Sequence, residues 1–170
     1  CYCCPPQVAR VFGQLHRWAY GTRGDDVWVH LYGGSTLRAE LPGRGRVELE
    51  QTTDYPWRGE VRFVWNAAPT GETALRLRIP GWARNQVLPG DLYSFSDKYD
   101  ELPVIKVNGK PIPYTVEKGF AALKRKWKKG DKVELNLPMP VRKVVANNHV
   151  KDNIGKVSII RGPITYCAEQ

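Results

Sequence analysis

Apolar residues follow two different spacings along the chain, and the spacing changes near residue 20. The first set recurs at intervals of three and four residues, as one face of a helix does; its members are Val8, Val11, Phe12, Leu15, Trp18 and Ala19. Pro5 and Pro6 suit the start of this helix, because the N–H groups of a first turn have no hydrogen-bond partner within the helix and proline lacks this group. The stretch GTRGDD at 21–26 then ends the helical pattern.

From residue 27 onward the pattern predicts short strands. Residues 73–79 alternate most clearly, with leucine and isoleucine toward one side and arginine toward the other. Asn108-Gly109 predicts a hairpin turn between strands at 104–107 and 112–116. Further strands are expected at 27–32, 36–41, 47–53, 60–65, 120–127, 132–137, 141–146, 157–161 and 164–168. Strands at this spacing are typical of an antiparallel sandwich.

The predicted fold class is therefore mainly β, an antiparallel β-sandwich preceded by one helix. We assign residues 1–20 to the helical segment and 21–140 to the sandwich, with a long loop at 84–102 that has no periodicity. Residues 141–170 are expected to form further strands, which would begin a second β-sandwich. The helix cannot bury its own apolar stripe, so we expect its partners to be helices on its N-terminal side. Because the sequence opens inside a motif, without an initiator Met or a signal peptide, it is expected to be a piece of a longer protein.

Composition and charge change this picture little. With 42% hydrophobic residues the chain can build a sizeable core, and it has no apolar run near the ~18 residues of a membrane span, so no membrane is expected as a partner. The net charge of +9 could suggest nucleic acid. However, the densest basic run, 124–132, lies where a strand ends and a hairpin turns, and no nucleic-acid-binding motif surrounds it. We interpret the run as a solvated edge protected by lysines, and we expect no nucleic-acid partner.

Three of the first four residues are cysteines, and three interpretations of Cys1, Cys3 and Cys4 stay open. Disulfides within the cluster would be strained, and the remaining cysteine, Cys167, lies at the far end of the chain. Burial at a helix start is a second interpretation, although three thiols are a heavy use of a reactive residue for packing. A metal or catalytic thiolate site is the third, because a helix N-terminus favours negative charge and thiolates bind zinc strongly.

A tetrahedral zinc site needs more donors than Cys3 and Cys4 provide. The histidines of the chain, His16, His30 and His149, are isolated in the sequence and offer no obvious completion. Any missing ligands are therefore expected upstream of residue 1.

Four motifs resemble glycoside hydrolase family 127 and its relative, family 146. CYCCPPQVAR at 1–10 is similar to the signature C-x-C-C-P-P-N-(I/V)-A-R, with Gln7 where the family usually has Asn. VWVHLY at 27–32 resembles the strand L-Y-V-N-L-Y, and RIPGWA at 78–83 matches R-I-P-x-W-A. VSIIRGPITYC at 157–167 resembles V-A-(I/V)-x-R-G-P-(I/L)-V-Y-C. The matches keep their order across the whole chain, and 84–102 is more similar to the Bacteroidetes-type family 146 branch.

This resemblance implies that the helix is left over from an (α/α)6 catalytic barrel, which is followed by β-sandwich domains. It implies a retaining, zinc-dependent β-L-arabinofuranosidase that acts on plant arabinose-containing oligosaccharides or polysaccharides. Cys3 matches the family's nucleophile, and Cys3 and Cys4 match its zinc ligands. A glutamate and a cysteine upstream would complete the zinc site, and the acid/base would be a further upstream glutamate. Both the barrel and the acid/base are absent from this chain, so the chain alone is expected to be inactive. The family's usual substrates suggest a periplasmic or extracellular location.

A non-catalytic accessory or carbohydrate-binding module is the alternative function. Sugar rings stack on exposed aromatic side chains, and Trp57, Trp65, Trp82, Tyr93 and Tyr99 are the residues available for this. Trp65 and Trp82 stand beside apolar strands and are expected in the core or at a domain interface. Tyr93 and Tyr99 lie in the long loop and are therefore the candidates for sugar contact.

Overall fold

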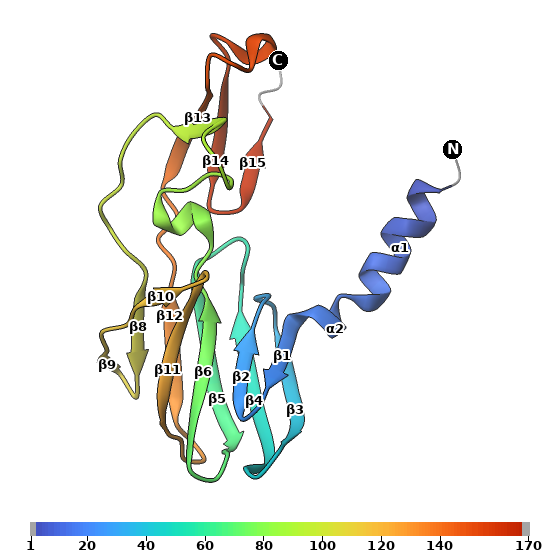
Figure 1. The fold of residues 1–170 in the computed structure, drawn as a ribbon, viewed down its shortest axis with the longest axis vertical. Helices are drawn as coiled ribbons and strands as arrows, with labels where there is room; N and C mark the ends of the chain where they lie inside the picture. The colour runs from blue at the N-terminus through green and yellow to red at the C-terminus, as the bar shows by residue number, and fades with distance from the viewer. Residues whose placement is uncertain (1–2, 168–170) are drawn as a thin grey trace.

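The computed structural model describes residues 3–167, in which a helical segment precedes strands that form three sheets (Figure 1). The helices are α1 (Cys4–Gln14) and α2 (His16–Ala19), and the short 3₁₀ helices are η1 (Gly81–Arg84) and η2 (Lys151–Asn153). The strands are β1 (Tyr20–Arg23), β2 (Asp26–Val29), β3 (Ser35–Leu41), β4 (Gly45–Thr53), β5 (Glu60–Ala67), β6 (Glu72–Arg78), β7 (Tyr93–Phe95), β8 (Val104–Val107), β9 (Lys110–Pro111), β10 (Val116–Glu117), β11 (Phe120–Lys126), β12 (Lys132–Asn136), β13 (Val141–Ala146), β14 (Val157–Arg161) and β15 (Ile164–Tyr166).

The two larger sheets face each other as a sandwich. One has the strand order β1-β2-β6-β11-β10, and the other has the order β3-β4-β5-β12-β8-β9. A third sheet, β15-β14-β13-β7, lies beyond one end of the sandwich (Figure 1). Among the described residues, neighbouring strands pair antiparallel except β2 and β6, which run parallel. The predicted fold class, a mainly antiparallel β-sandwich after one helical segment, is confirmed.

The core lies between the two larger sheets, because alternate residues of each strand point inward. Fully buried members from both sheets include Val27, Val29, Leu49, Val61, Phe63, Trp65, Leu75, Leu77, Ala121, Val133 and Leu135. At one end of this layer, the rings of Trp65 and Trp127 lie 5.7 Å apart between centroids. The indole N–H of Trp127 donates a hydrogen bond to the carbonyl of Thr73 at 3.0 Å, which satisfies its buried polar atom.

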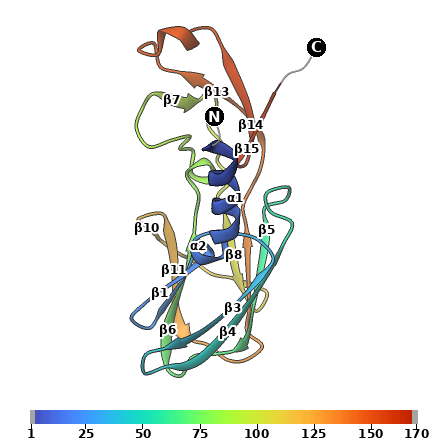
Figure 2. The same cartoon turned by 90° about the vertical axis from the view of Figure 1, so that its right-hand side faces the viewer.

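The helical segment projects away from the sandwich (Figures 1 and 2). The predicted single helix is divided in two at Leu15, and α1 contains no buried residue. Its apolar side chains Val8, Val11 and Phe12 are 55%, 45% and 71% exposed. The segment joins the sandwich where the carbonyl of Ala19 accepts hydrogen bonds from the backbone N–H groups of His30 and Leu31. No helix in residues 3–167 is long and apolar enough to cross a membrane.

Two strands were not expected from the sequence, and one expected strand is interrupted. Tyr20–Arg23 pairs with β2 despite its glycine, and His30 explains why Gly21 fits there: a Cβ at Gly21 would lie 2.9 Å from His30 Nε2. The strand expected at 112–116 is replaced by the two-residue strands β9 and β10. Pro111 and Pro113 account for this, because proline has no N–H to donate to a ladder.

The basic run ends at a solvent-exposed hairpin. β10 pairs only with the first two residues of β11. Within the described chain, the rest of β11, where Lys124 and Lys126 are exposed, pairs with β6 alone. Lys124 Nζ lies 3.4 Å from Glu72 Oε2. In the turn that follows, Asp131 Oδ2 accepts the backbone N–H of Lys128 at 2.9 Å. The lysines therefore project into solvent around a turn that Asp131 stabilises.

The segment 84–102 belongs structurally to the third sheet. Its strand β7 pairs with β13, with Phe95 opposite Val144. Arg142 of β13 is 5% exposed and binds this segment with its whole guanidinium group. It donates to Asn85 Oδ1 at 2.7 Å and lies 3.3 Å from the Asp97 carboxylate, and its Cζ lies 3.5 Å from the centre of the Phe95 ring. One buried side chain thus fixes the segment to the sheet.

The outer face of the first sheet carries a small aromatic cluster. The ring of Phe120 meets the rings of Trp28 and His30 edge to face, at 4.9 and 5.4 Å between centroids. Arg76 covers the Trp28 ring and forms an ion pair with Asp26 at 2.8 Å. Burial in this cluster, together with the charge of Arg78, lowers the pKa of His30.

Replacing Arg142 with Ala should lower the free energy of unfolding by about 2–3 kcal/mol, because it removes the buried side chain that joins β13 to Asn85, Phe95 and Asp97. Arg142→Lys should recover only part of this, since an ammonium cannot reproduce the planar fork. Urea unfolding measures the change. The control is Arg38→Ala, which removes an exposed ion pair with Glu48 and should cost under ~1 kcal/mol. Equal losses for the two alanine variants would contradict the assignment.

The lowered pKa of His30 predicts an acid-side loss of stability. The folded chain binds fewer protons at His30 than the unfolded chain, so this contribution is complete above the unfolded value of 6.5 and is lost as the pH falls through the folded pKa. Because the ring is only partly buried, the effect should stay below about 1 kcal/mol. In urea unfolding from pH 7 to 5, His30→Gln should weaken the pH dependence relative to the wild type. An identical slope for the variant and the wild type would disprove the link.

Candidate functional site

The cysteine pair lies at the first turn of α1. Cys3 is the N-cap residue, and its carbonyl accepts the backbone N–H of Gln7 at 3.2 Å, the first bond of the helix. Both Cys3 and Cys4 are exposed to solvent. Pro5 and Pro6 fill the rest of the first turn and carry no N–H, so fewer backbone donors than usual are available at this helix start. The helix alone therefore offers a thiolate limited hydrogen bonding.

The separation of the two sulfurs limits what the pair can do. Cys3 Sγ and Cys4 Sγ lie 3.8 Å apart. A disulfide requires ~2.05 Å, so these two residues are not bonded to each other. Two thiolates on one tetrahedral zinc ion, each at ~2.3 Å from the metal, would be separated by roughly 3.8 Å. The geometry of the pair therefore fits two adjacent positions of a zinc site. Cys1 lies outside the described residues.

No other ligand set accompanies the pair within residues 3–167. In this range no group of three or more His, Cys, Asp or Glu side chains is arranged to hold a metal ion. His16 lies in α2, His30 is packed in the aromatic cluster, and His149 lies in the loop after β13. None of the three histidines belongs to a group of this kind within residues 3–167.

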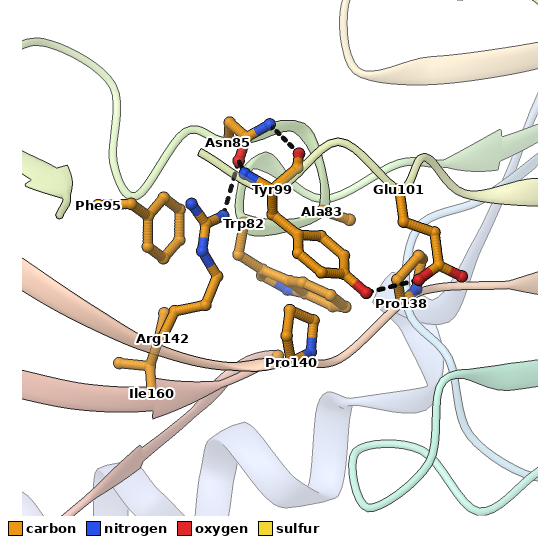
Figure 3. Close-up of a pocket in the computed structure, with 11 residues that line it drawn as sticks. Trp82, Ala83, Asn85, Phe95, Tyr99, Glu101, Pro138, Pro140, Arg142 and Ile160 are labelled. Atoms are coloured by element: carbon orange, nitrogen blue, oxygen red, sulfur yellow. Dashed lines mark hydrogen bonds between the residues drawn. The ribbon is translucent and has the colours of Figure 1, made fainter. Parts of the chain in front are cut away.

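A small cavity lies where the sandwich meets the third sheet (Figure 3). It is lined by residues that include Trp82, Asn85, Phe95, Tyr99 and Arg142. Its volume of about 10 Å³ is close to the minimum for one water molecule. The cavity is therefore part of the packing around Arg142 and is too small for a sugar.

The two tyrosines predicted to contact sugar make intramolecular hydrogen bonds. The hydroxyl of Tyr99 donates to Glu101 at 2.5 Å, as Figure 3 shows, and its backbone exchanges two hydrogen bonds with the side chain of Asn85. The hydroxyl of Tyr93 accepts from Asn153 Nδ2 at 3.2 Å. Sugar contact by Tyr93 or Tyr99 stays a prediction.

The tryptophans differ sharply in exposure. Trp65 is fully buried, and Trp82 packs against the core and lines the small cavity, as expected. Trp57 instead is 68% exposed in the loop between β4 and β5. The sequence does carry a signal that separates the two, because Trp65 ends the predicted strand 60–65 whereas Trp57 follows Pro56 outside any predicted strand. Arg142 was missed, since its partners Asn85 and Asp97 lie 57 and 45 residues away in the chain.

Two known domain families match most of the chain. Residues 26–139 match the middle domain of the GH127 β-L-arabinofuranosidases, and residues 141–170 match the C-terminal domain of glycoside hydrolase family 127. The boundary between the two matches falls between β12 and β13, where the chain leaves the sandwich for the third sheet.

Individual relatives agree with these matches. A non-reducing end β-L-arabinofuranosidase of Bifidobacterium longum subsp. longum is 33% identical over 177 aligned residues, which cover 100% of this chain and 24% of that protein. The solved structure of a GH127 β-arabinofuranosidase is 40% identical with a TM-score of 0.92, covering 99% of this chain and 26% of its own. A GH127 β-L-arabinofuranosidase from Geobacillus stearothermophilus T6 is 38% identical with a TM-score of 0.81, covering 98% and 24%.

The chain thus spans about a quarter of the length of these relatives. The match to the middle-domain family covers well over half of the chain, and the two solved relatives superpose on nearly all of it. On this basis the chain belongs to glycoside hydrolase family 127: residues 26–139 match its middle domain, residues 141–170 match its C-terminal domain, and a cysteine-bearing helix precedes both.

Proposed function

We propose that this chain is the C-terminal part of a retaining glycoside hydrolase that releases β-L-arabinofuranose from plant arabinose-containing glycans, with Cys3 as nucleophile. The observation that carries the proposal is the pair of exposed thiols at the start of α1, 3.8 Å apart, in a chain of this family. Relatives are named as β-L-arabinofuranosidases, which supports the choice of sugar.

Retention of configuration needs two displacements at the anomeric carbon. In the first, the Cys3 thiolate attacks that carbon, a C–S bond forms and the glycosidic C–O bond breaks, while an acid supplied by another part of the enzyme protonates the leaving oxygen. In the second, the same group removes a proton from water, which attacks the carbon, and the C–S bond breaks to restore the thiolate. Each displacement inverts the centre, so the product keeps the original configuration.

Cys3 must be a thiolate at working pH and must also leave readily. Pro5 and Pro6 reduce the backbone donors at this helix start, so hydrogen bonding from α1 provides little of that stabilisation. Zinc, when bound by Cys3 and Cys4, would hold the sulfur as thiolate and stabilise it again as leaving group. Cys4 would act as a ligand that keeps the metal beside the nucleophile. Two further ligands would come from an upstream segment.

In the longer protein that carries this chain, Cys3→Ser should reduce hydrolysis of an aryl β-L-arabinofuranoside by about 10³-fold or more, because the nucleophile is lost. Cys4→Ser should lower both activity and zinc content, measured by elemental analysis. Cys167→Ser, which changes an exposed thiol at the other end of the chain, should leave both unchanged. Full activity without Cys3 would refute the assigned role.

Residues 1–170 alone should show no measurable hydrolysis of the same substrate, because the acid and half of the metal ligands are supplied elsewhere. The comparison uses equal molar amounts of the short chain and the longer protein. Clear turnover by the purified 170-residue chain would show that the two thiols do not depend on the missing groups.

A further inference from the structure

The helical segment leaves the sandwich at a buried hydrogen-bond network. α2 ends at Ala19, and the next residue, Tyr20, begins β1 (Figure 1). Tyr20 lies opposite Val29 in the ladder with β2, and its ring packs against the core. Its hydroxyl contacts Ser35 of β3 and Gln51 of β4, which belong to the other large sheet. One side chain at the base of the helical segment therefore connects both sheets.

The direction of each hydrogen bond in this network is determined. The hydroxyl of Ser35 donates to the carbonyl of Gly33 at 2.8 Å, so it has no proton left for Tyr20. Tyr20 therefore donates to Ser35 Oγ at 2.9 Å. Gln51 Nε2 donates to the hydroxyl oxygens of Tyr20 and Ser35, at 3.0 and 3.2 Å. Burial raises the pKa of Tyr20, so its hydroxyl keeps this proton at neutral pH.

Gln51 is an unfavourable residue for a core position. It is 2% exposed, and within the described residues its Oε1 has no hydrogen-bond partner. A buried polar atom without a partner destabilises the folded state, whereas an apolar side chain of similar volume has no such penalty. Buried polar groups can instead define a single arrangement of the chain, at a cost in stability. Stability alone therefore does not account for Gln51.

The backbone attaches the same junction to one side only. The carbonyl of Ala19 accepts the N–H groups of His30 and Leu31 at 2.9 and 3.3 Å, and these two residues directly follow β2 of the first sheet. Beyond this point α1 contains no buried residue. The contacts of Tyr20 with Gln51 and Ser35 add an attachment to the second sheet, so the junction is fixed from two directions.

A small change at this junction has a large effect at the thiols. Leu15, between α1 and α2, keeps helical backbone angles of φ −56° and ψ −37°, so the chain from Cys3 to Ala19 is helical throughout. At about 1.5 Å per residue this segment is roughly 25 Å long, and a tilt of about 5° at its base displaces its far end by about 2 Å. Misplacement of a reacting group by about 1 Å can lower a rate by about 100-fold.

We propose that Tyr20 and Gln51 are positioning residues for Cys3. Their buried hydrogen bonds set the angle at which the helical segment leaves the sandwich, and this angle holds the Cys3 thiol in place relative to the groups that an upstream segment supplies. The role rests on the proposed function, in which Cys3 is the nucleophile. Because both residues act through Cys3, removing either network side chain should slow the chemical step without weakening substrate binding.

The test replaces each polar side chain with an apolar one of similar volume in the longer protein. Tyr20→Phe and Gln51→Met should each lower kcat for an aryl β-L-arabinofuranoside by about tenfold and leave KM within about twofold of the wild type. Gln51→Met should not lower the melting temperature, because it removes a buried atom that has no partner. The matched control is Tyr114→Phe, which removes a part-buried hydroxyl that donates to the carbonyl of Pro103, and it should leave kcat unchanged.

Alkylation of Cys3 by iodoacetamide, followed by mass spectrometry, gives a readout that does not depend on turnover. Tyr20→Phe and Gln51→Met should change this rate several-fold, because the thiol then lies in altered surroundings, whereas Tyr114→Phe should not change it. Hydrogen exchange locates the cause. The amides of His30 and Leu31, which donate to Ala19, should exchange faster in the two network variants than in the wild type or the control.

Wild-type kcat and wild-type alkylation in both network variants would overturn the positioning role. So would a parallel loss of activity and melting temperature in all three variants, because the network would then only stabilise the fold. If the wild-type protein has no arabinofuranosidase activity, the proposed function fails and alkylation alone decides the positioning role. A changed rate at Cys3 in the network variants would then sustain it, and an unchanged rate would overturn it.

Discussion

The apolar layer between the two larger sheets is the interaction on which the rest of the structure depends. Residues from β2, β6 and β11 interdigitate there with residues from β4, β5 and β12, and most of them are completely buried. The layer is closed at one end by the paired rings of Trp65 and Trp127. The helical segment, the loop between β4 and β5, and the third sheet all join the sandwich at the ends of its strands.

The helical segment depends on that layer in a different way. It is joined to the sandwich through Ala19 and β1, yet α1 itself buries nothing against the described chain. The two thiols are therefore placed at the far end of a helix whose apolar face is exposed. The proposed metal site would be incomplete in the same way, because Cys3 and Cys4 fit two of four tetrahedral positions. We propose one explanation for both features, that an upstream segment supplies the helix contacts and the remaining ligands.

The alternation of apolar residues predicted the strands whose ends are marked by a local turn. The bounds expected for 104–107, 141–146 and 157–161 are those of β8, β13 and β14, because in each case apolar alternation starts and stops at a clear turn. β1 and β7 were not predicted, because neither stretch shows apolar alternation. Each is a strand only through its backbone pairing, β1 with β2 and β7 with β13. The cysteine motif was visible in the sequence since its chemistry lies in adjacent residues.

The features that sequence could not reveal depend on three-dimensional contacts. From the sequence, Arg142 is an ordinary basic residue on a strand. Its contacts with Asn85, Phe95 and Asp97 are seen only in the structure. The strand pattern places Trp65 in the core, but the 68% exposure of Trp57 is known only from the structure. Sites built from one short stretch can be predicted in this way, and sites built by packing cannot.

The most direct measurement of the central claim is X-ray absorption at the zinc edge of the longer protein, on the wild type and on Cys4→Ala. The account predicts one zinc per chain with sulfur scatterers at ~2.3 Å, and a lower sulfur number or loss of the metal in the variant. Absence of zinc, or the same sulfur number in both proteins, would contradict it and leave the thiols at the start of α1 without a metal.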